Sequence, residues 1–311
     1  MNKVLVTGCS GFLASHLLKL LARDAASRIF GMTEVSGFSH PQVEVCQVDI
    51  RRRDDVLHLL AAIRPDVVYH LAAVTHVAFS WKNPSLTYDV NFIGSSNLLE
   101  AILPVSPHAR VVLMSTAEVY RSGLETPINE DSPTRCHNPY ALSKLAMEML
   151  GDLYWKSRGL NVCKLRAFNF TGPGQDNQFV ASDFASQVAA IEKGKREAVI
   201  RVGNLADIRD FSDVRDVARY VQALGRHGLG GEVYNLCSGR SYSIRAILDI
   251  LLSLARQPVR VEVDAAKFRP LDNPQINGDP ARIRNEFGLR PEIAMEQTLL
   301  DLLNYWREFP G

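Results

Sequence analysis

Two short stretches of the chain hold residue types suited to proton transfer: Ser115 and Thr116, then Tyr140 and Lys144. A tyrosine phenol is a weak acid, with a free pKa of about 10. On a helix, Lys144 lies one turn after Tyr140 on the same face, where its ammonium would lower the pKa of the phenol. A hydroxyl from a separate strand would hold a carbonyl or alcohol oxygen against that phenol. The pattern predicts redox chemistry on a carbon–oxygen bond.

Within this cluster we expect Tyr140 and Lys144 to be catalytic and Thr116 to hold the substrate oxygen, with Ser115 as the second candidate for that role. Glu118 has two interpretations: a general base that removes a proton from carbon, or a loop carboxylate without a chemical role. Taken singly, Tyr140 would be a half-buried helix tyrosine and Lys144 a solvated charge. Their joint occurrence downstream of a nucleotide-binding turn favours catalysis.

The nucleotide-binding turn is the run Thr7-Gly8-Cys9-Ser10-Gly11-Phe12-Leu13-Ala14, between a predicted strand and a predicted helix. Glycines there allow a tight turn and a close approach of the backbone to a pyrophosphate, which the helix amino terminus stabilises. The alternative is a plain strand-to-helix turn. Its position in the first βαβ unit favours a dinucleotide, with contacts expected from Gly8, Ser10, Gly11, Phe12 and Leu13.

Two further strand ends are expected to contact the cofactor. Asp49 and Ile50 follow the third predicted strand, where Asp49 touches the adenine, caps the next helix, or does both. The small run Leu71, Ala72 and Ala73 ends the fourth predicted strand and leaves space where a cofactor would cross. These positions complete the predicted NAD(P)H site.

The choice between the two nicotinamide cofactors depends on the residues after the second predicted strand. Residues 31–35 include no arginine that would receive a 2′-phosphate. Glu34 would repel such a phosphate if it faces the ribose, although a solvated surface glutamate is the alternative. The sequence therefore favours NAD(H).

Composition excludes several other classes of protein. The chain has 311 residues and a net charge of +1, so no bulk field attracts it to nucleic acid or to an anionic membrane. Five scattered cysteines without a Cys-x-x-Cys pair argue against a disulfide framework and a zinc site. No apolar run reaches the length of a membrane span. A first strand at the very start leaves no room for a signal peptide, so we expect a cytoplasmic protein without a metal.

The first half of the chain alternates apolar strands with amphipathic helices. Strands are predicted over residues 3–7, 28–32, 43–48, 66–71, 110–115 and 161–166. Helices are predicted over residues 12–23, 54–63, 84–103 and 139–158. This order predicts an α/β fold with a Rossmann-type doubly wound parallel sheet and ligands at the carboxyl ends of its strands.

After residue 166 the pattern changes. A long loop is predicted over residues 169–178 because they are rich in Gly, Pro, Asn and Gln. Helices are predicted over residues 180–194, 213–224, 244–256 and 295–309, and a strand is predicted over residues 232–236. Whether this strand returns to the main sheet is left open. Most of this half is expected to form a smaller substrate-binding lobe.

Several of these motifs together resemble the extended short-chain dehydrogenase/reductase family over the whole chain. They are Thr7-Gly8-x-x-Gly11, Asp49, Leu71-Ala72-Ala73, Asn91, Ser115-Thr116 and Tyr140-x-x-x-Lys144. The resemblance implies an NAD(P)-binding Rossmann domain over 1–168, with a returning segment near 205–240, and a lobe over 169–311 that mostly binds a nucleotide sugar. It also implies a homodimer through a four-helix bundle built from residues 84–103 and 139–158.

Four later stretches are similar to GDP-4-keto-6-deoxy-D-mannose reductases and to the neighbouring GDP-mannose 4,6-dehydratases: residues 166–175, 202–216, 233–239 and 269–274. By this resemblance Asn169 and Asn204 hydrogen-bond the nucleotide sugar, and Arg209 pairs with its diphosphate. Arg269 and Asp272 would hold the diphosphate and ribose end. Surface salt bridges are the alternative for both arginines.

The resemblance implies NAD(P)H-dependent reduction of the C4 ketone of GDP-4-keto-6-deoxy-D-mannose. The product would be GDP-6-deoxy-D-mannose (GDP-D-rhamnose) or its C4 epimer. Two enzymatic alternatives stay open: a GDP-mannose 4,6-dehydratase, with Glu118 as its base, and a 4-epimerase of another nucleotide sugar. A nucleotide-sensing scaffold without activity is disfavoured because Tyr140 and Lys144 are both present.

Overall fold

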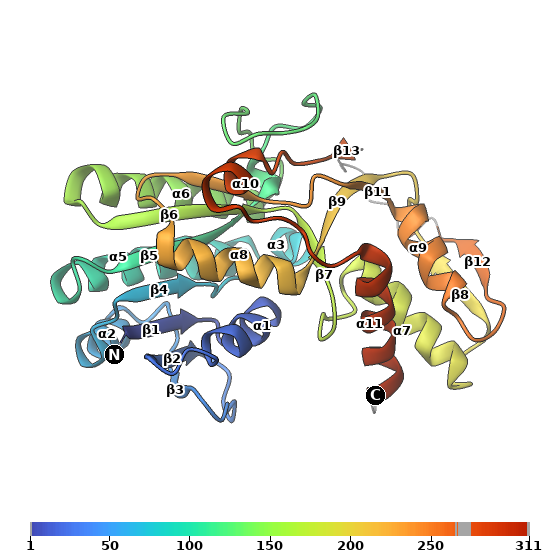
Figure 1. Ribbon diagram of the computed structural model, residues 1–311, viewed down its shortest axis with the longest axis horizontal. Helices are drawn as coiled ribbons and strands as arrows, with labels where there is room; N and C mark the ends of the chain where they lie inside the picture. The colour runs from blue at the N-terminus through green and yellow to red at the C-terminus, as the bar shows by residue number, and fades with distance from the viewer. Residues whose placement is uncertain (1, 265, 267–274, 310–311) are drawn as a thin grey trace. The chain divides into compact units, whose positions relative to one another are not determined.

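The computed structural model describes residues 2–264, 266 and 275–309, which form two compact units (Figure 1). Unit 1 consists of residues up to 121, 130–167 and 218–236. Unit 2 consists of residues 122–129, 168–217 and those from 237 onward. The chain therefore enters each unit more than once.

Unit 1 is built on a parallel sheet, which has seven strands in the part of the chain that the structure describes, in the order β10-β6-β5-β4-β1-β2-β3. These strands are β1 (Asn2–Thr7), β2 (Ser27–Thr33), β3 (Glu44–Gln47), β4 (Val67–His70), β5 (Arg110–Thr116), β6 (Asn161–Ala167) and β10 (Val233–Leu236). The order of strands reverses between β1 and β4, and ligands bind at such switch points. The predicted Rossmann-type doubly wound sheet is confirmed, and β10 does return to it beside β6.

Helices cover both faces of this sheet. They are α1 (Phe12–Leu21), α2 (Arg53–Ile63), α3 (Val77–Lys82), α4 (Pro84–Tyr88), α5 (Gly94–Val105), α6 (Pro139–Arg158) and α8 (Val214–His227), whose residues from 218 on belong to unit 1. On one face Leu5, Val68 and Leu113 share a core with α2, α5 and α6. On the other, the Tyr69 hydroxyl donates to the backbone oxygen of Gln222 on α8, which Figure 1 shows crossing the sheet.

Helix α6 begins and ends where its sequence specifies. The Asn138 side chain accepts a hydrogen bond from the backbone N–H of Ala141 at 2.7 Å, and Pro139 occupies the first helical position. Gly159 ends the helix in the left-handed conformation, with φ of 68°. The predicted bounds of 139–158 are thus confirmed, and they fix the turn on which Tyr140 and Lys144 lie.

The helix predicted over residues 84–103 is wrong as a single element. The chain forms α4, then a π-helical turn η1 (Asp89–Ile93), then α5. Asn91 within η1 bonds a neighbouring loop through its side chain. A widened turn of this kind is frequent at functional sites because it re-aims a side chain without ending the helix.

Unit 2 combines short strands with four helices among its described residues. The strands are β7 (Asn169–Thr171), β8 (Val199–Val202), β9 (Ile208–Asp213), β11 (Ser241–Ser243), β12 (Arg260–Val263) and β13 (Gln275–Ile276). The helices are α7 (Val180–Glu192), α9 (Ile244–Ser253), α10 (Ala281–Phe287) and α11 (Met295–Glu308). The core joins α7, α9 and α11 through residues such as Phe184, Leu248 and Leu302. The loop predicted from residue 169 is wrong at its start, because β7 pairs with β9 and its partner lies about 40 residues away in sequence.

Three aspartates after Arg209 connect distant segments of unit 2. Asp210 accepts hydrogen bonds from the backbone N–H groups of Ser238 and Gly239, each at 2.8 Å. Asp213 accepts from the Thr298 hydroxyl, and Asp216 accepts from the backbone of residues 292 and 293. All three side chains are buried. Every third residue of this stretch therefore holds a distant segment of unit 2 in place through hydrogen bonds.

The turn after β1, predicted to bind the nucleotide, offers a test of packing. Gly8 has φ of +66°, and a Cβ there would lie 2.7 Å from the backbone Cα of Ala72. Gly37 has φ of +75° with nothing within 4 Å of its Cβ position. We expect Gly37→Ala to cost about 1 kcal/mol from backbone strain. Gly8→Ala should cost a further 1–3 kcal/mol, roughly, because the backbone must shift. Urea unfolding measures both, and equal losses would contradict the close approach.

Candidate active site

The end of β5 lies against the first turns of α6, and this brings the predicted catalytic residues together. The side chain of Thr116 hydrogen-bonds the phenol of Tyr140. The ammonium of Lys144 donates to the backbone oxygen of Met114 at 2.7 Å. Tyr140 and Lys144 are both buried. Thr116, Tyr140 and Lys144 therefore form one cluster in unit 1.

The two hydroxyl candidates of β5 have different partners. Ser115 donates its hydroxyl to the carboxylate of Glu148, further along α6. Thr116 accepts a hydrogen bond from the backbone N–H of Glu118 at 3.2 Å and also bonds the phenol of Tyr140. Successive side chains of a strand point to opposite faces, so only one of the pair can face a given group. Thr116 is the hydroxyl beside the phenol.

Glu118 is half-buried in the short helical turn η2 (Ala117–Val119). Its carboxylate accepts a hydrogen bond from the side-chain amide of Asn138 at 3.1 Å. Its charge also acts to raise the pKa of Tyr140, so it lies near the phenol. Both interpretations of Glu118, as a base and as a loop carboxylate, remain compatible with this position.

The protonation of the cluster differs from the expectation. Burial raises the pKa of Tyr140 to about 12, and the hydrogen bond from Thr116 opposes this only in part. Burial lowers the pKa of Lys144 to about 8, against the opposite effect of the Glu148 charge. The ammonium donates to the backbone oxygen of Met114, and the pKa of the phenol follows from burial, Thr116 and Glu118. At neutral pH the phenol keeps its proton and can donate it.

Asn91 connects α6 to the loop after β4. Its side chain accepts from the backbone N–H of Val74 at 2.8 Å and donates to the backbone oxygen of Val74 at 2.9 Å. The same amide nitrogen donates to the hydroxyl of Ser143, which donates to the backbone oxygen of Tyr140. The π-helical turn thus holds the helix that presents Tyr140.

A buried histidine that the sequence analysis missed lies beneath this loop. His70 Nδ1 is 2.7 Å from the Thr7 hydroxyl, and its Nε2 is 2.8 Å from the Ser95 hydroxyl. Ser95 donates to the backbone oxygen of Asn91, so it accepts from a proton on Nε2. Burial lowers the pKa of His70 to about 3, which keeps the ring neutral. The apolar run around His70 gave no signal of these partners.

The turn after β1 has the geometry that a phosphate group needs. Gly8 adopts a left-handed conformation, and the backbone N–H of Gly11 donates to the oxygen of Gly8 at 2.9 Å. Gly11 stands at the N-cap of α1, where it has no side chain to cover the first amide groups. The hydroxyl of Ser10 lies 2.9 Å from that of Thr33 at the end of β2. These residues fit a pyrophosphate at the start of α1.

The other predicted cofactor residues have different surroundings. Leu71 and Ala72 donate backbone N–H bonds to the Thr7 hydroxyl, with Ala73 half-buried after them. Ile50 is buried in the core of unit 1.

Asp49 binds the guanidinium and the backbone N–H of Arg51, and this arginine lowers the pKa of the carboxyl. Arg51 also lies 3.8 Å from Glu34. The guanidinium of Arg51 therefore lies near the segment after β2. The sequence analysis did not foresee this cation, because Arg51 belongs to the loop after β3.

In unit 2 two of the predicted substrate residues share a partner. The Asn204 amide donates to one oxygen of Asp207 at 2.6 Å, and Arg209 donates to the other at 3.2 Å. Asn169 is exposed on β7. Arg269 and Asp272 lie outside the described residues. The salt bridge considered as the alternative for Arg209 is present, but it is largely buried rather than at the surface, with Arg209 only 13% exposed.

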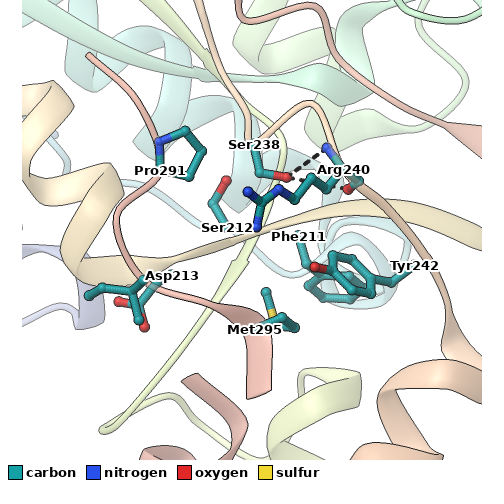
Figure 2. A pocket seen from close by; sticks show the side chains of 9 residues that line it. Phe211, Ser212, Asp213, Ser238, Arg240, Tyr242, Pro291 and Met295 are labelled. Carbon is teal, nitrogen blue, oxygen red and sulfur yellow. Dashed lines mark hydrogen bonds between the residues drawn. The ribbon is translucent and has the colours of Figure 1, made fainter. Parts of the chain in front are cut away.

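A small pocket of unit 2 lies at the carboxyl end of β9 (Figure 2). It is lined by Phe211, Ser212, Asp213, Ser238, Arg240, Tyr242, Pro291, Ile293 and Met295. None of the residues that the sequence analysis assigned to substrate or cofactor is among them. The pocket therefore shares no lining residue with the predicted site.

Within residues 2–264, 266 and 275–309, no group of three or more His, Cys, Asp or Glu side chains is arranged to hold a metal ion. Among the helices of those same residues, none is long and apolar enough to cross a membrane.

Comparison with known proteins gives consistent results over nearly the whole chain. A family model described as GDP-mannose 4,6 dehydratase matches residues 5–302. The chain is 33% identical to GDP-6-deoxy-D-mannose reductase of Pseudomonas aeruginosa, covering 98% of this chain and 97% of that protein. It is 31% identical to GDP-6-deoxy-D-talose 4-dehydrogenase of Aggregatibacter actinomycetemcomitans, covering 96% of each. The structure of RMD from Pseudomonas aeruginosa complexed with NADPH is similar with a TM-score of 0.87 and 31% identity, covering 99% of both chains.

The neutral His70 predicts a pH-dependent stability. An unfolded histidine binds a proton near pH 6.5, whereas folded His70 does so near pH 3. The unfolded state binds more protons between these values, so stability falls as pH falls through this window. The slope from this group is at most about 1.4 kcal/mol per pH unit. We expect His70→Gln to flatten the curve of unfolding free energy between pH 6.5 and 4.5.

Urea unfolding at several pH values measures this effect. His108→Gln, at an exposed histidine of the same unit, is the control and should keep the wild-type slope. Parallel curves for wild type and His70→Gln would contradict the assignment.

Proposed function

The chain belongs to the GDP-mannose 4,6-dehydratase family, and from that premise we propose that it reduces the C4 ketone of GDP-4-keto-6-deoxy-D-mannose with NAD(P)H. The product is GDP-6-deoxy-D-mannose or its C4 epimer. The names of two relatives contain 6-deoxy-D-mannose and 6-deoxy-D-talose. These two sugars differ only at C4, so they correspond to the two possible products.

The observation that most supports reduction is the protonated phenol of Tyr140 bonded to Thr116. Reduction of a ketone needs a proton donor at the oxygen, and a phenol with a pKa of about 12 keeps its proton at neutral pH. The buried Lys144 adds a positive charge below a pH of about 8. That charge favours the phenolate left after the proton has moved.

The proposed reaction balances as one hydride and one proton. A reduced dinucleotide, when bound, supplies the hydride that becomes the new C–H bond at C4. The carbonyl oxygen accepts the Tyr140 proton as the C=O π bond breaks, and the phenolate regains a proton from water. Thr116 holds the substrate oxygen, and Lys144 steadies the charge of the phenolate and binds the cofactor ribose.

We assign the dinucleotide to the segments of unit 1 that end β1, β3 and β4. Gly8, Ser10, Gly11, Phe12 and Leu13 would hold its pyrophosphate at the start of α1. Its adenine and ribose would be lined by the residues after β3 and β4, namely Asp49, Ile50, Leu71, Ala72 and Ala73.

NADH is the proposed preference over NADPH. Glu34 opposes a 2′-phosphate, and the nearby guanidinium of Arg51 is already bound to Asp49. Because the structure of one relative is complexed with NADPH, the preference is tested by measuring kcat/KM with each cofactor. A higher kcat/KM with NADPH would contradict this preference.

The nucleotide sugar is assigned to unit 2, in line with a Rossmann domain over 1–168 and a substrate lobe over 169–311. Asn169 and Asn204 would bind the sugar, and Arg209 the diphosphate, with Arg269 and Asp272 as further contacts. Arg209 would exchange its bond with Asp207 for diphosphate oxygens, which a guanidinium binds through two nitrogens.

One observation favours a second function, that of a GDP-mannose 4,6-dehydratase. Such an enzyme would use bound NAD(P)⁺ to take a hydride from C4, remove a proton from carbon, eliminate water and return the same hydride to C6. Glu118 lies close enough to Tyr140 to affect its pKa, and a carboxylate there could remove the proton from carbon.

We also infer a homodimer through α6 and the α4–α5 region. Leu142, Met149 and Leu153 are 50%, 62% and 61% exposed, and they recur along α6 away from its buried face. Large apolar residues gathered on one face favour a protein partner. A monomer in sedimentation experiments at micromolar concentration would contradict this inference.

The two functions are separated by the substrate that each consumes. The purified protein is mixed either with GDP-mannose alone or with GDP-4-keto-6-deoxy-D-mannose plus NADH or NADPH. The proposed reductase leaves GDP-mannose unchanged and oxidises the reduced cofactor only with the keto sugar. Formation of the keto sugar from GDP-mannose alone would instead identify a dehydratase.

Removal of the phenol oxygen tests the proton donor. We expect Tyr140→Phe to lower kcat by roughly 10²- to 10⁴-fold, the usual contribution of a positioned acid. Cofactor affinity and the unfolding midpoint should change little, which fluorescence titration and urea unfolding measure. A variant that retains wild-type kcat would refute the role of Tyr140.

The diphosphate assignment is tested by Arg209→Ala. Hydrogen bonds to charged groups contribute about 1.5–3 kcal/mol, so the Kd for the nucleotide sugar should rise by about 10- to 150-fold. Arg245→Ala is the matched control, since Arg245 forms an exposed ion pair with Asp249 in the same unit. Isothermal calorimetry measures both, and an unchanged Kd for Arg209→Ala would show that this side chain does not bind the diphosphate.

A further inference from the structure

Glu148 lies on the same face of α6 as the proposed catalytic pair, four residues after Lys144 and eight after Tyr140. Its side chain is only 4% exposed. Arg166 on β6 binds this carboxylate through two nitrogens, with Nη2 at 2.7 Å from one oxygen and Nε at 3.1 Å from the other. Ser115, opposite Arg166 in the β5–β6 register, donates its hydroxyl to the same carboxylate.

Three successive residues of β5 are therefore each bonded to one residue of α6. The backbone oxygen of Met114 accepts from Lys144, the Ser115 hydroxyl donates to Glu148, and Thr116 bonds Tyr140. Two of these three attachments form the proposed proton-transfer group. The third attachment, through Glu148, joins that group to β6.

We propose that Glu148 is a positioning residue for the reduction: anchored by Arg166, it fixes Ser115 so that Thr116 faces Tyr140, and it places a carboxylate one helical turn from the amine of Lys144. This inference rests on the proposed function. Glu148 contacts neither substrate nor cofactor in the scheme and acts through its neighbours on β5 and α6.

The titratable and charged groups around Lys144 support the electrostatic part of this proposal. On α6 they are Glu148 and the phenol of Tyr140. On β4 it is His70, which is neutral and whose pKa the Lys144 charge lowers further. From β6 Arg166 faces Glu148, and from η2 Glu118 acts on Tyr140. The negative charge that raises the pKa of Lys144 is that of Glu148.

A purely structural role is the competing explanation. A buried ion pair is weak evidence of stabilisation, because desolvation offsets much of the attraction. Loss of one partner nevertheless destabilises a protein, since it leaves the other charge buried alone. The test must therefore separate stability from the charge state of Lys144.

The experiment compares Glu148→Gln with Glu192→Gln in the full-length protein. Glu192 forms a similar two-nitrogen pair with Arg307, 5% and 13% exposed, in unit 2. Both variants should lose stability. In Glu148→Gln alone, the alkaline limb of kcat/KM against pH should move to lower pH by about one unit or more, because an opposite charge has been removed from Lys144.

A second readout does not depend on the substrate. NMR titration of ¹⁵N-labelled lysine side chains, with Lys144 assigned by Lys144→Arg, should give a lower pKa for Lys144 in Glu148→Gln and an unchanged one in Glu192→Gln. If Glu148→Gln does not fold, Glu148→Gln/Arg166→Gln removes the lone buried charge and is titrated instead. An unchanged Lys144 titration would overturn the proposal.

Ser115→Ala tests the geometric part. It keeps the Glu148–Arg166 pair but removes its link to β5, so we expect kcat to fall about tenfold with the Lys144 titration unchanged. Wild-type kcat in Ser115→Ala would overturn this part. If wild type does not reduce the keto sugar while Lys144 still titrates lower in Glu148→Gln, the proposed function fails and the coupling of the two residues stands.

Discussion

The attachment of α6 to the end of β5 is the constraint on which the candidate site depends. Polar groups buried in a medium of low dielectric must be paired, because an unpaired one costs far more than it does in water. Here the partners come from adjacent residues of one strand and successive turns of one helix. The helix cannot slide or rotate without leaving buried polar groups unpaired.

The same burial sets the chemistry available to the cluster. It raises the pKa of Tyr140 and lowers that of Lys144, so the two groups lie further apart in acidity than they do in water. A phenol that stays protonated beside a charged lysine is suited to giving up its proton only when new negative charge appears nearby. The cluster is thus arranged for the negative oxygen of a reacting carbonyl.

Features specified by local sequence were predictable. Asn138, Pro139 and Gly159 mark both ends of α6, and the continuous apolar strands indicate a parallel sheet covered on two faces. The spacing of Tyr140 and Lys144 is likewise a property of a single helix. The predicted bounds of α6 and the order of alternating strands and helices therefore agree with the structure.

Features that depend on distant partners were not predictable. His70 becomes significant only through Thr7 and Ser95, and the π-helical turn forms where Asn91 bonds a loop 17 residues before it. The strand that begins at Asn169 pairs with β9. In each case the residue types are ordinary, and the fold supplies the partner.

The alternation of the chain between the two units has a consequence for its biosynthesis. Strand β10 of unit 1 is made after more than fifty residues of unit 2, and unit 2 is completed by the last helix of the chain. During synthesis on the ribosome, the edge of β6 that pairs with β10 stays unpaired until the intervening segment has emerged. No single cut of the chain yields both units as intact fragments, so neither unit can be made whole from one uninterrupted segment of the sequence.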